Sequence, residues 1–223
     1  MKGLFVTGTD TGVGKTEVAC AVARIWRARG LTVGACKPAE TGCAPDPLDA
    51  KRLAAAANDT RPLDEICPVQ LAEPLAPAVA ARRARVTIEK SRLVAAIEAA
   101  GRGRDRVIVE SAGGVLVPYA DDCDGVDLIV ASGLPALLVG RLGLGTINHV
   151  RLTVEILRAR KIKLTGVVLS VGGAGAAPPV GDVAAETNAG VLSELLPGVP
   201  VLVFPHVDSK NPPRIPALEN LVV

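Results

Sequence analysis

The sequence predicts an α/β fold, with a doubly wound, mostly parallel sheet and helices on both faces. Two observations lead to this prediction. The expected strands are continuous apolar runs, such as VIV at 107–109 and ALLVG at 136–140, as in strands buried on both faces. Helical patterns separate these runs, which is the alternation typical of βαβ units. At 223 residues, the chain is expected to form a single domain that spans residues 1–223.

The expected elements alternate along the whole chain. Strands are expected at residues 3–6, 32–37, 105–111, 135–141, 164–170 and 200–205. Helices are expected at residues 15–30, 47–58, 87–101, 146–161 and 180–196. The proline-rich residues 68–78 are predicted to form an irregular connection.

Two helix ends carry local signals. In the first expected helix, Val18, Val22 and Trp26 form one apolar stripe at helical spacing. Gly30 is expected to end this helix, because glycine readily adopts the left-handed conformation of a C-terminal cap. Thr87 is expected to begin the third helix as its N-cap.

The composition argues against nucleic acid and membrane partners. The net charge is only +2 and aromatic residues make up 2%, so neither a basic footprint nor a base-stacking platform is expected. The arginines between residues 82 and 106 have no aromatic residues among them, and we interpret them as a solvated surface. The apolar run 128–140 is interrupted by Ser132, Gly133 and Pro135, so no membrane span is expected.

The cysteines indicate a reducing compartment. The five cysteines are odd in number and contain no C-x-x-C pair, so neither a disulfide framework nor a zinc site is expected. The opening apolar run ends at Gly8 and Asp10, which argues against a signal peptide. We therefore expect a cytoplasmic protein.

Residues 7–17, TGTDTGVGKTE, nearly match the phosphate-binding loop of nucleotide-using enzymes. They lie between the first expected strand and the first helix, the context that such a loop requires. Small residues let backbone N–H groups face phosphate oxygens, and the helix N-terminus favours the anion. Lys15 can reach the outer phosphates, and the Thr16 hydroxyl can bind Mg²⁺. The sequence thus predicts a P-loop NTPase-like fold, although the standard spacing would require a glycine at Thr9 rather than at Gly8.

Three further charged residues each have two interpretations, and two of them, Lys37 and Glu110, stand at expected strand ends on the same edge of the sheet. Glu110 precedes the small residues SAGG, and is either an ordinary polar strand end or a metal-binding carboxylate beside a phosphate. Asp49 begins a helix, as a capping acid or as a second metal ligand. Lys37 is either a surface ion-pair partner or a charge that stabilises a transferring phosphoryl group.

Four motifs together resemble the dethiobiotin synthetase family. They are TGTDTGVGKT at 7–16, CKPAETG at 36–42, VESAGG at 109–114 and GLGTINH at 143–149. They occur in the order and approximate spacing of that family. The resemblance covers nearly the whole chain and weakens after residue 171. The six-residue spacing from Gly8 to Gly14 is the variant that this family uses.

The resemblance implies an enzyme that uses ATP and Mg²⁺ to carboxylate 7,8-diaminononanoate with CO₂ and to close a cyclic urea. The implied route runs through a carbamate and a carbamic–phosphoric mixed anhydride, and releases ADP and phosphate. A homodimer is also implied, because in the family the far end of the substrate lies near a dimer interface. No nucleic acid or membrane partner is implied.

The resemblance further implies roles for particular residues. Catalysis is assigned to Thr11, Lys15 and Lys37, and Mg²⁺ binding to Thr16, Asp49 and Glu110. Nucleotide binding is assigned to Gly12, Val13, Gly14, Lys15, Thr16, Glu17, Asp49, Glu110, Ser111, Ala112, Gly113, Ser170, Pro205, His206 and Val207. The substrate is assigned to Thr41, where the family usually has Ser, and its carboxylate to Gly145, Thr146 and Asn148.

Some positions depart from the family pattern. Gly12 stands where some members carry Glu. Ser170 and Val171 replace a common Asn-Asp pair that reads the adenine edge, and residues 204–207 match a second base-contacting segment only in position. We therefore expect weaker recognition of adenine by side chains.

Two rival functions are considered. A partition or cell-division ATPase switch would share the sheet and a related loop, but such proteins carry a signature lysine where this chain has Asp10. The synthetase half of a cobyrinate-type amidotransferase would need a second, glutaminase domain, for which 223 residues are expected to leave no room.

Overall fold

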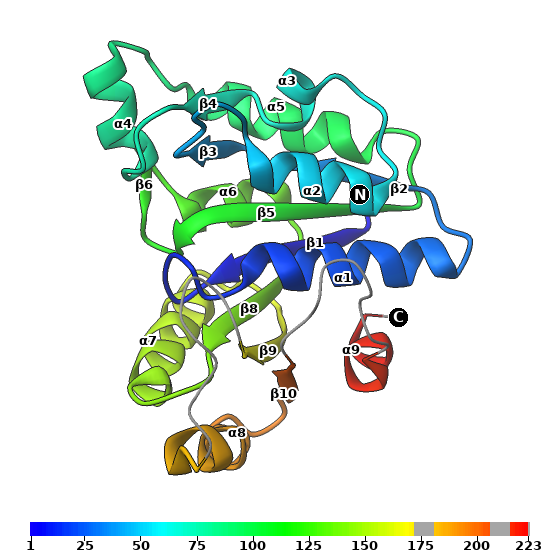
Figure 1. The fold of residues 1–223 in the computed structure, drawn as a ribbon, viewed down its shortest axis with the longest axis vertical. Helices are drawn as coiled ribbons and strands as arrows, with labels where there is room; N and C mark the ends of the chain where they lie inside the picture. The colour runs from blue at the N-terminus through cyan, green and yellow to red at the C-terminus, as the bar shows by residue number, and fades with distance from the viewer. Residues whose placement is uncertain (172–180, 206–214, 223) are drawn as a thin grey trace.

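A six-stranded parallel sheet forms the centre of the molecule (Figure 1). The computed structural model describes residues 1–171, 181–205 and 215–222. The sheet has the order β10-β9-β8-β1-β5-β2, and each neighbouring pair is parallel. Its strands are β1 (Gly3–Gly8), β2 (Val33–Cys36), β5 (Arg106–Gly114), β8 (Ala136–Arg141), β9 (Leu164–Ser170) and β10 (Val201–Phe204). The predicted doubly wound parallel sheet is confirmed.

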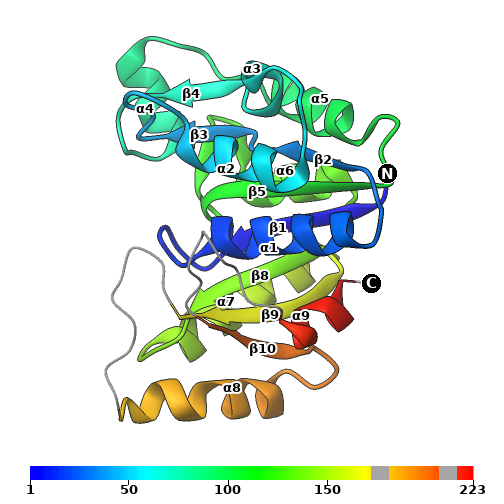
Figure 2. The same ribbon diagram turned by 45° about the vertical axis from the view of Figure 1, so that its right-hand side comes forward.

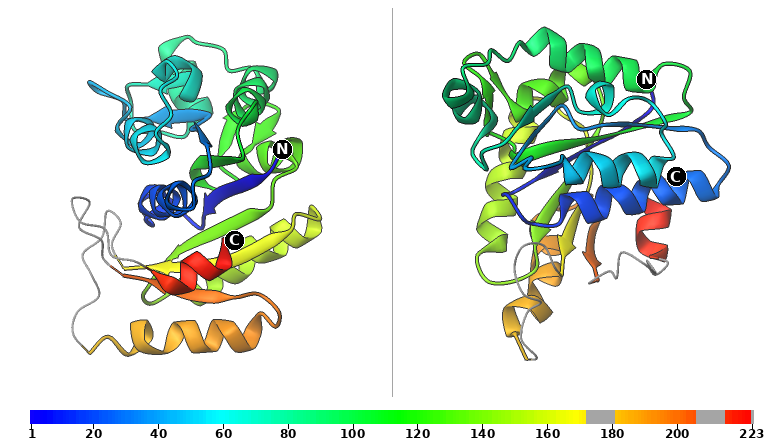
Figure 3. Two further views of the ribbon diagram at one scale, coloured as in Figure 1. Left: turned by 90° about the vertical axis from the view of Figure 1, so that its right-hand side faces the viewer. Right: turned by 45° about the horizontal axis from the view of Figure 1, so that its top comes forward.

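Helices cover both faces of this sheet (Figures 2 and 3). One face is covered by α1 (Lys15–Ala28), α2 (Leu48–Ala57) and α9 (Pro216–Leu221). The other is covered by α5 (Lys90–Gly101), α6 (Gly125–Ser132), α7 (Thr146–Ala159) and α8 (Val183–Leu195). Side chains alternate between the faces, so that Val6 packs with α1 whereas its neighbour Phe5 packs with α5 and α6. Burial on both sides explains why the strands read as continuous apolar runs.

The strand order brings several strand ends together at one edge. The chain leaves the central β1 for β2 at one side, returns through β5, and then adds β8, β9 and β10 on the other side. In parallel sheets of this kind, ligands bind beyond the carboxyl ends of the strands, where the order reverses. The connection from β1 to α1 lies at this point.

Smaller elements extend the carboxyl edge. Strand β3 (Ala39–Thr41) pairs in parallel with β4 (Val69–Leu71), and β6 (Pro118–Ala120) pairs antiparallel with β7 (Cys123–Asp124). The helices α3 (Leu63–Ile66) and α4 (Pro77–Ala84) flank β4 along the chain. The prediction of an irregular connection at 68–78 is therefore wrong where β4 and the start of α4 lie. Strand β4 forms because it hydrogen-bonds to β3, a segment distant in the sequence, and the proline-rich composition of residues 68–78 does not indicate this pairing.

Three further predictions are corrected. Helix α5 begins at Lys90, and Thr87 does not cap it, because the extended connection instead buries Ile88 in the core. Strand β5 continues beyond Ser111, since its last residue, Gly114, pairs with Gly8 of β1. Helix α6 was not predicted from the sequence. By contrast, Gly30 ends α1 as predicted, with φ +81°.

No helix in the described ranges is long and apolar enough to cross a membrane. The most apolar candidate from the sequence, residues 128–140, divides between the end of α6 and strand β8. The left-handed Gly133, with φ +63°, lies between them.

The edge strand β2 is held on its outer side by an ion pair. The Asp59 carboxylate accepts a hydrogen bond from the Ala35 N–H at 2.8 Å, and Arg61 donates to the Ala35 carbonyl at 2.7 Å. Arg61 and Asp59 are themselves 2.7 Å apart. Exposed strand edges invite pairing with other chains, and here side chains occupy the free backbone groups. The strand that leads to Lys37 is therefore anchored on both sides.

Gly34 of β2 allows the strand to approach α5 closely. A Cβ atom at this position would lie 1.8 Å from the Ala100 carbonyl oxygen. We expect Gly34→Ala to lower the free energy of unfolding by about 1–3 kcal/mol, because the backbone on one side must move. Gly190→Ala is the matched control, since its Cβ would meet nothing within 4 Å on α8. There we expect a gain of about 0.5–1 kcal/mol from helix propensity. Urea unfolding of both variants tests this, and equal effects would contradict it.

Candidate active site

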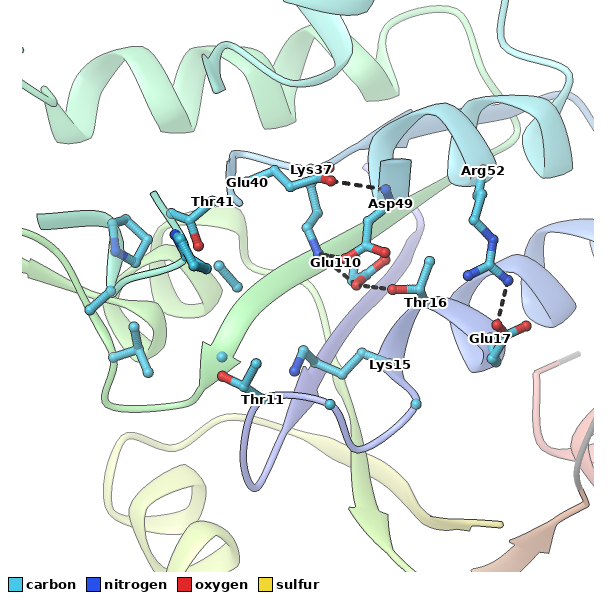
Figure 4. A pocket seen from close by; sticks show the side chains of 18 of the residues that line it. Thr11, Lys15, Thr16, Glu17, Lys37, Glu40, Thr41, Asp49, Arg52 and Glu110 are labelled. Atoms are coloured by element: carbon cyan, nitrogen blue, oxygen red, sulfur yellow. Dashed lines mark hydrogen bonds and ion pairs between the residues drawn. The ribbon is translucent and has the colours of Figure 1, made fainter. Parts of the chain in front are cut away.

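A cavity of about 820 Å³ lies at the carboxyl edge of the sheet (Figure 4). Its wall comes from the loop after β1, the ends of β2, β5 and β10, and the start of α2. The residues that line it are Thr11, Gly12, Gly14, Lys15, Thr16, Glu17, Lys37, Glu40, Thr41, Asp49, Arg52, Pro74, Leu75, Ala76, Pro77, Glu110, Ala112, Gly113, Val117, Phe204 and Pro205. The sequence motifs around Lys15, Lys37 and Glu110 therefore meet in one place.

The loop between β1 and α1 has the shape that an anion-binding loop needs. Gly12 and Gly14 have φ of +71° and +92°, a conformation that a side chain would strain. Val13 is buried beneath the loop and anchors it. The Lys15 side chain bends back toward the loop, and its Nζ donates to the Asp10 carbonyl at 2.8 Å. Figure 4 shows this ammonium directed into the cavity between Thr11 and Glu110.

Lys37 lies at the centre of a buried charge cluster. Its Nζ is 2.6 Å from Glu110 Oε1 and 3.3 Å from Asp49 Oδ2, and it also donates to the Ser111 carbonyl at 3.3 Å. The Thr16 hydroxyl donates to the same Glu110 oxygen at 2.7 Å. The surface interpretation of Lys37 is thus wrong, because its side chain is 2% exposed. A buried ammonium is stable here only because two carboxylates accompany it.

The two lysines differ in electrostatic state. Burial lowers the pKa of Lys15 to about 8, and repulsion from Lys37 acts in the same direction. Burial also opposes the charge of Lys37, but the nearby Glu110 and Asp49 carboxylates outweigh it and raise the Lys37 pKa above its ordinary value. Burial alone would raise the pKa of Asp49, yet Lys37 holds it below its ordinary value. Lys15 is therefore the cation that a bound anion would complement most.

The oxygen atoms near Lys37 fit a magnesium ion. Glu110 Oε2 is buried and has no hydrogen-bond partner among the described residues. The Thr16 hydroxyl and the Asp49 carboxylate lie beside the same Lys37–Glu110 pair. Within the part of the chain described, no cluster of three acidic, His or Cys side chains suits a metal held by protein alone. This donor set suits Mg²⁺, which takes hard oxygens and fills its other positions with water and phosphate.

Several predicted site residues lie away from the cavity wall. Ser111 is buried behind the wall, and Ser170 is buried at the end of β9, beside Phe204 of β10. Gly145, Thr146 and Asn148 lie at the start of α7 and do not line the cavity. His206 and Val207 lie outside the described residues.

The cavity also contains side chains that were not predicted from the sequence. Glu40 accepts hydrogen bonds at the start of α2, and Arg52 of α2 pairs with Glu17 of α1. The segment Pro74–Pro77 gives the cavity an apolar wall. Behind the cavity, the buried Tyr119 hydroxyl accepts the Ala112 N–H at 2.5 Å. The sequence offered one signal for Glu40: it lies in the motif CKPAETG, between the assigned residues Lys37 and Thr41.

Comparison with known proteins gives the family. A family model described as an AAA domain matches residues 2–204. An ATP-dependent dethiobiotin synthetase of Anaeromyxobacter dehalogenans (strain 2CP-C) is 46% identical over 206 residues, which cover 92% of this chain and 90% of the relative. The chain belongs to the ATP-dependent dethiobiotin synthetase family. A relative with the same description from Thermodesulfovibrio yellowstonii is 38% identical over 226 residues, with coverage of 96% and 92%.

The solved structures agree on the fold. Cell division protein FtsY from Thermotoga maritima matches with a TM-score of 0.52 at 16% identity, over 99% of this chain and 68% of FtsY. The structural similarity shows a shared P-loop NTPase-like fold, and at this identity it supports the fold alone. The family resemblance in the four sequence motifs is confirmed, and the two rival functions are not favoured. The chain is an ATP-using enzyme of the ligase type.

The different surroundings of the two lysines predict different defects. We expect Lys15→Ala to weaken nucleotide binding and slow turnover, because Lys15 lies over the phosphate loop. We expect Lys37→Ala to keep ATP affinity but to lower kcat by about 100-fold or more, the loss typical of one preorganised charge. Calorimetry with ATP and steady-state kinetics separate these effects. Lys51→Ala, on the exposed side of α2, is the control and should resemble wild type. Lost ATP affinity with intact turnover in Lys37→Ala would contradict these roles.

Proposed function

We propose that this enzyme makes dethiobiotin from 7,8-diaminononanoate, CO₂ and ATP, with Mg²⁺. The observation that carries the proposal is the meeting of the phosphate loop with the Lys37, Asp49 and Glu110 cluster in one cavity. Family membership supports the choice of reaction.

The proposed reaction has three steps. One amine of the substrate attacks CO₂ and loses a proton, which gives a carbamate. A carbamate oxygen attacks the γ-phosphorus of ATP, and ADP leaves as the mixed anhydride forms. The second amine then attacks the carbonyl carbon, the C–O bond to phosphate breaks, and the ring closes with release of a proton and phosphate. The first step places negative charge on the carbamate, and the second and third steps place it on the transferred phosphoryl group, so cations are needed at both positions.

Lys15 and Lys37 are proposed to supply that stabilisation from two sides. Lys15, next to the loop, would contact the phosphate oxygens that remain on ADP and those that transfer. Lys37, fixed by Glu110 and Asp49, would face the carbamate oxygen and the phosphoryl group. Thr11 lies at the mouth of the loop and would donate to the same oxygens (Figure 4). A preorganised ammonium needs no rearrangement during the reaction, which is the main source of its effect.

Thr16, Asp49 and Glu110 are proposed to hold the magnesium ion. The unpartnered Glu110 Oε2 supports this, because a buried carboxylate oxygen without a donor is costly unless a ligand completes it. When bound, Mg²⁺ would supply positive charge that neutralises part of the phosphate charge. The nucleotide would lie along the loop, with its base toward Pro205 and the end of β10.

The substrate is proposed to occupy the other half of the cavity. Thr41 and the segment Pro74–Pro77 line that half, and the latter offers apolar surface to an aliphatic chain. Gly145, Thr146 and Asn148, which the family resemblance assigns to the substrate carboxylate, lie outside the cavity of their own chain. We propose that the same residues of a second copy of the chain bind this carboxylate. Leu116 and Leu152 support a homodimer, since both are exposed apolar side chains and they line one shallow hollow together. All five cysteines are free, in keeping with a cytoplasmic location.

Coupling of ATP hydrolysis to carboxylation tests the proposed reaction. We expect ADP release to require both diaminononanoate and bicarbonate, because the attacking oxygen exists only after CO₂ is captured. The measurement is ADP release from Mg-ATP in CO₂-free buffer, with each addition omitted in turn. Equal release with and without bicarbonate, or stimulation by DNA or lipid instead, would overturn the proposal.

A further inference from the structure

Helix α2 begins without a capping side chain of its own. The residue at its N-cap position is Pro47, which has no side-chain acceptor. The N–H groups of the second and third helical residues, Asp49 and Ala50, instead donate to the Glu40 carboxylate at 2.9 and 2.8 Å. Glu40 comes from β3 and is 7% exposed. A carboxylate at this place satisfies free N–H groups and complements the helix dipole.

Glu40 binds the backbone of Asp49, whose side chain contacts Lys37. The Asp49 N–H binds Glu40, while Asp49 Oδ2 lies 3.3 Å from Lys37 Nζ. The Asp49 side chain is 40% exposed, so packing around it does little to hold it in place. Its backbone, by contrast, is tied to a buried strand residue. Figure 4 shows Glu40 reaching over to the start of α2, with the Asp49 carboxylate below it and near Glu110.

We propose that Glu40 is a positioning residue, which holds the start of α2 so that the Asp49 carboxylate faces the metal position beside Lys37 and Glu110. This inference rests on the proposed function, in which Asp49 binds Mg²⁺. Because Glu40 precedes Thr41 in β3, the same strand supports both the metal side and the substrate side of the cavity. Partners that orient metal ligands typically contribute 10- to 100-fold in metal affinity.

Two other roles for Glu40 are less consistent with the geometry. Both carboxylate oxygens accept a backbone N–H, one from Asp49 and one from Ala50. A direct metal ligand or a general base would have to use the lone pairs that these two hydrogen bonds leave free. Glu40 is nevertheless part of the cavity wall, so direct contact with substrate is an outcome that the experiment must distinguish.

Helix α8 offers a matched control. Its N-cap residue, Asp182, accepts the N–H groups of the second and third helical residues, Ala184 and Ala185, at 3.0 and 3.1 Å. The interaction is of the same kind as that of Glu40, on a helix of similar length that contributes no residue to the cavity wall. Asp182→Ala thus removes an equivalent helix cap without touching the site.

The test compares Glu40→Ala, Glu40→Gln and Asp182→Ala with wild type. Mn²⁺ is titrated into each protein with ADP and followed by electron paramagnetic resonance, while calorimetry gives ADP affinity without metal. We expect Glu40→Ala to weaken Mn²⁺ binding about 10-fold or more, with ADP affinity retained. The Gln variant keeps one acceptor and should show a smaller loss. Asp182→Ala should lower thermal stability by a similar amount and leave Mn²⁺ affinity unchanged.

Turnover adds a second readout. Raising Mg²⁺ should restore most of the kcat of Glu40→Ala, because the defect lies in holding the metal. Unchanged Mn²⁺ affinity in Glu40→Ala would overturn the inference, as would an equal loss in Asp182→Ala. Lost turnover that Mg²⁺ does not restore would also overturn it, by pointing to direct contact with substrate. If Glu40→Ala fails to fold, the Gln variant and amide exchange at residues 49 and 50 decide the question. The Mn²⁺ titration needs no diamine, so it stays informative even if the proposed reaction is wrong.

Discussion

The buried contact between Lys37 and Glu110 is the interaction on which the site depends. Lys37 directly follows β2, and Glu110 lies in the neighbouring strand β5. Their charged atoms, Nζ and Oε1, are 2.6 Å apart. Either charge alone would carry a desolvation cost of several kcal/mol at this depth. The same Glu110 oxygen also accepts the Thr16 hydroxyl, so this contact joins the end of β2, strand β5 and the start of α1. The arrangement keeps Lys37 protonated and stationary, which is what stabilisation of a transferring phosphoryl group requires.

The second lysine shows the complementary situation. In the described residues no ion pair is recorded for Lys15, and its ammonium rests on a single carbonyl. Burial next to Lys37 therefore lowers its pKa, whereas carboxylates raise that of Lys37. The cavity thus combines Lys37, which two carboxylates contact, with Lys15, which no described carboxylate contacts directly. A polyphosphate would supply the missing charge at Lys15 without disturbing the Lys37 pair.

The remaining site geometry comes from elements added to the sheet. Strand β3 forms by pairing with β4. Its Glu40 side chain accepts hydrogen bonds from the backbone at the start of α2. The buried Tyr119 hydroxyl accepts the Ala112 N–H of β5 in a comparable way. In both cases a side chain satisfies backbone N–H groups that would otherwise be unpaired. The loop after β1 thus belongs to the parallel sheet, whereas the position of Asp49 and the wall around Thr41 depend on these additions.

The sequence by itself determined the features that are local. Continuous apolar runs predicted the six sheet strands, and the small residues before Lys15 and Thr16, between a strand and a helix, marked the phosphate loop. In the structure Gly12 and Gly14 of this loop have positive φ. Lys15 follows the first expected strand, and Lys37 and Glu110 stand at the ends of two others, so the shared carboxyl edge of a parallel sheet accounts for their meeting in one cavity. Only the tertiary structure decided the pairing of β3 with β4, the cap from Glu40 to α2, and the distance of Gly145 from the cavity. These contacts join residues through space and leave no periodic pattern in the sequence, so no local propensity could have indicated them.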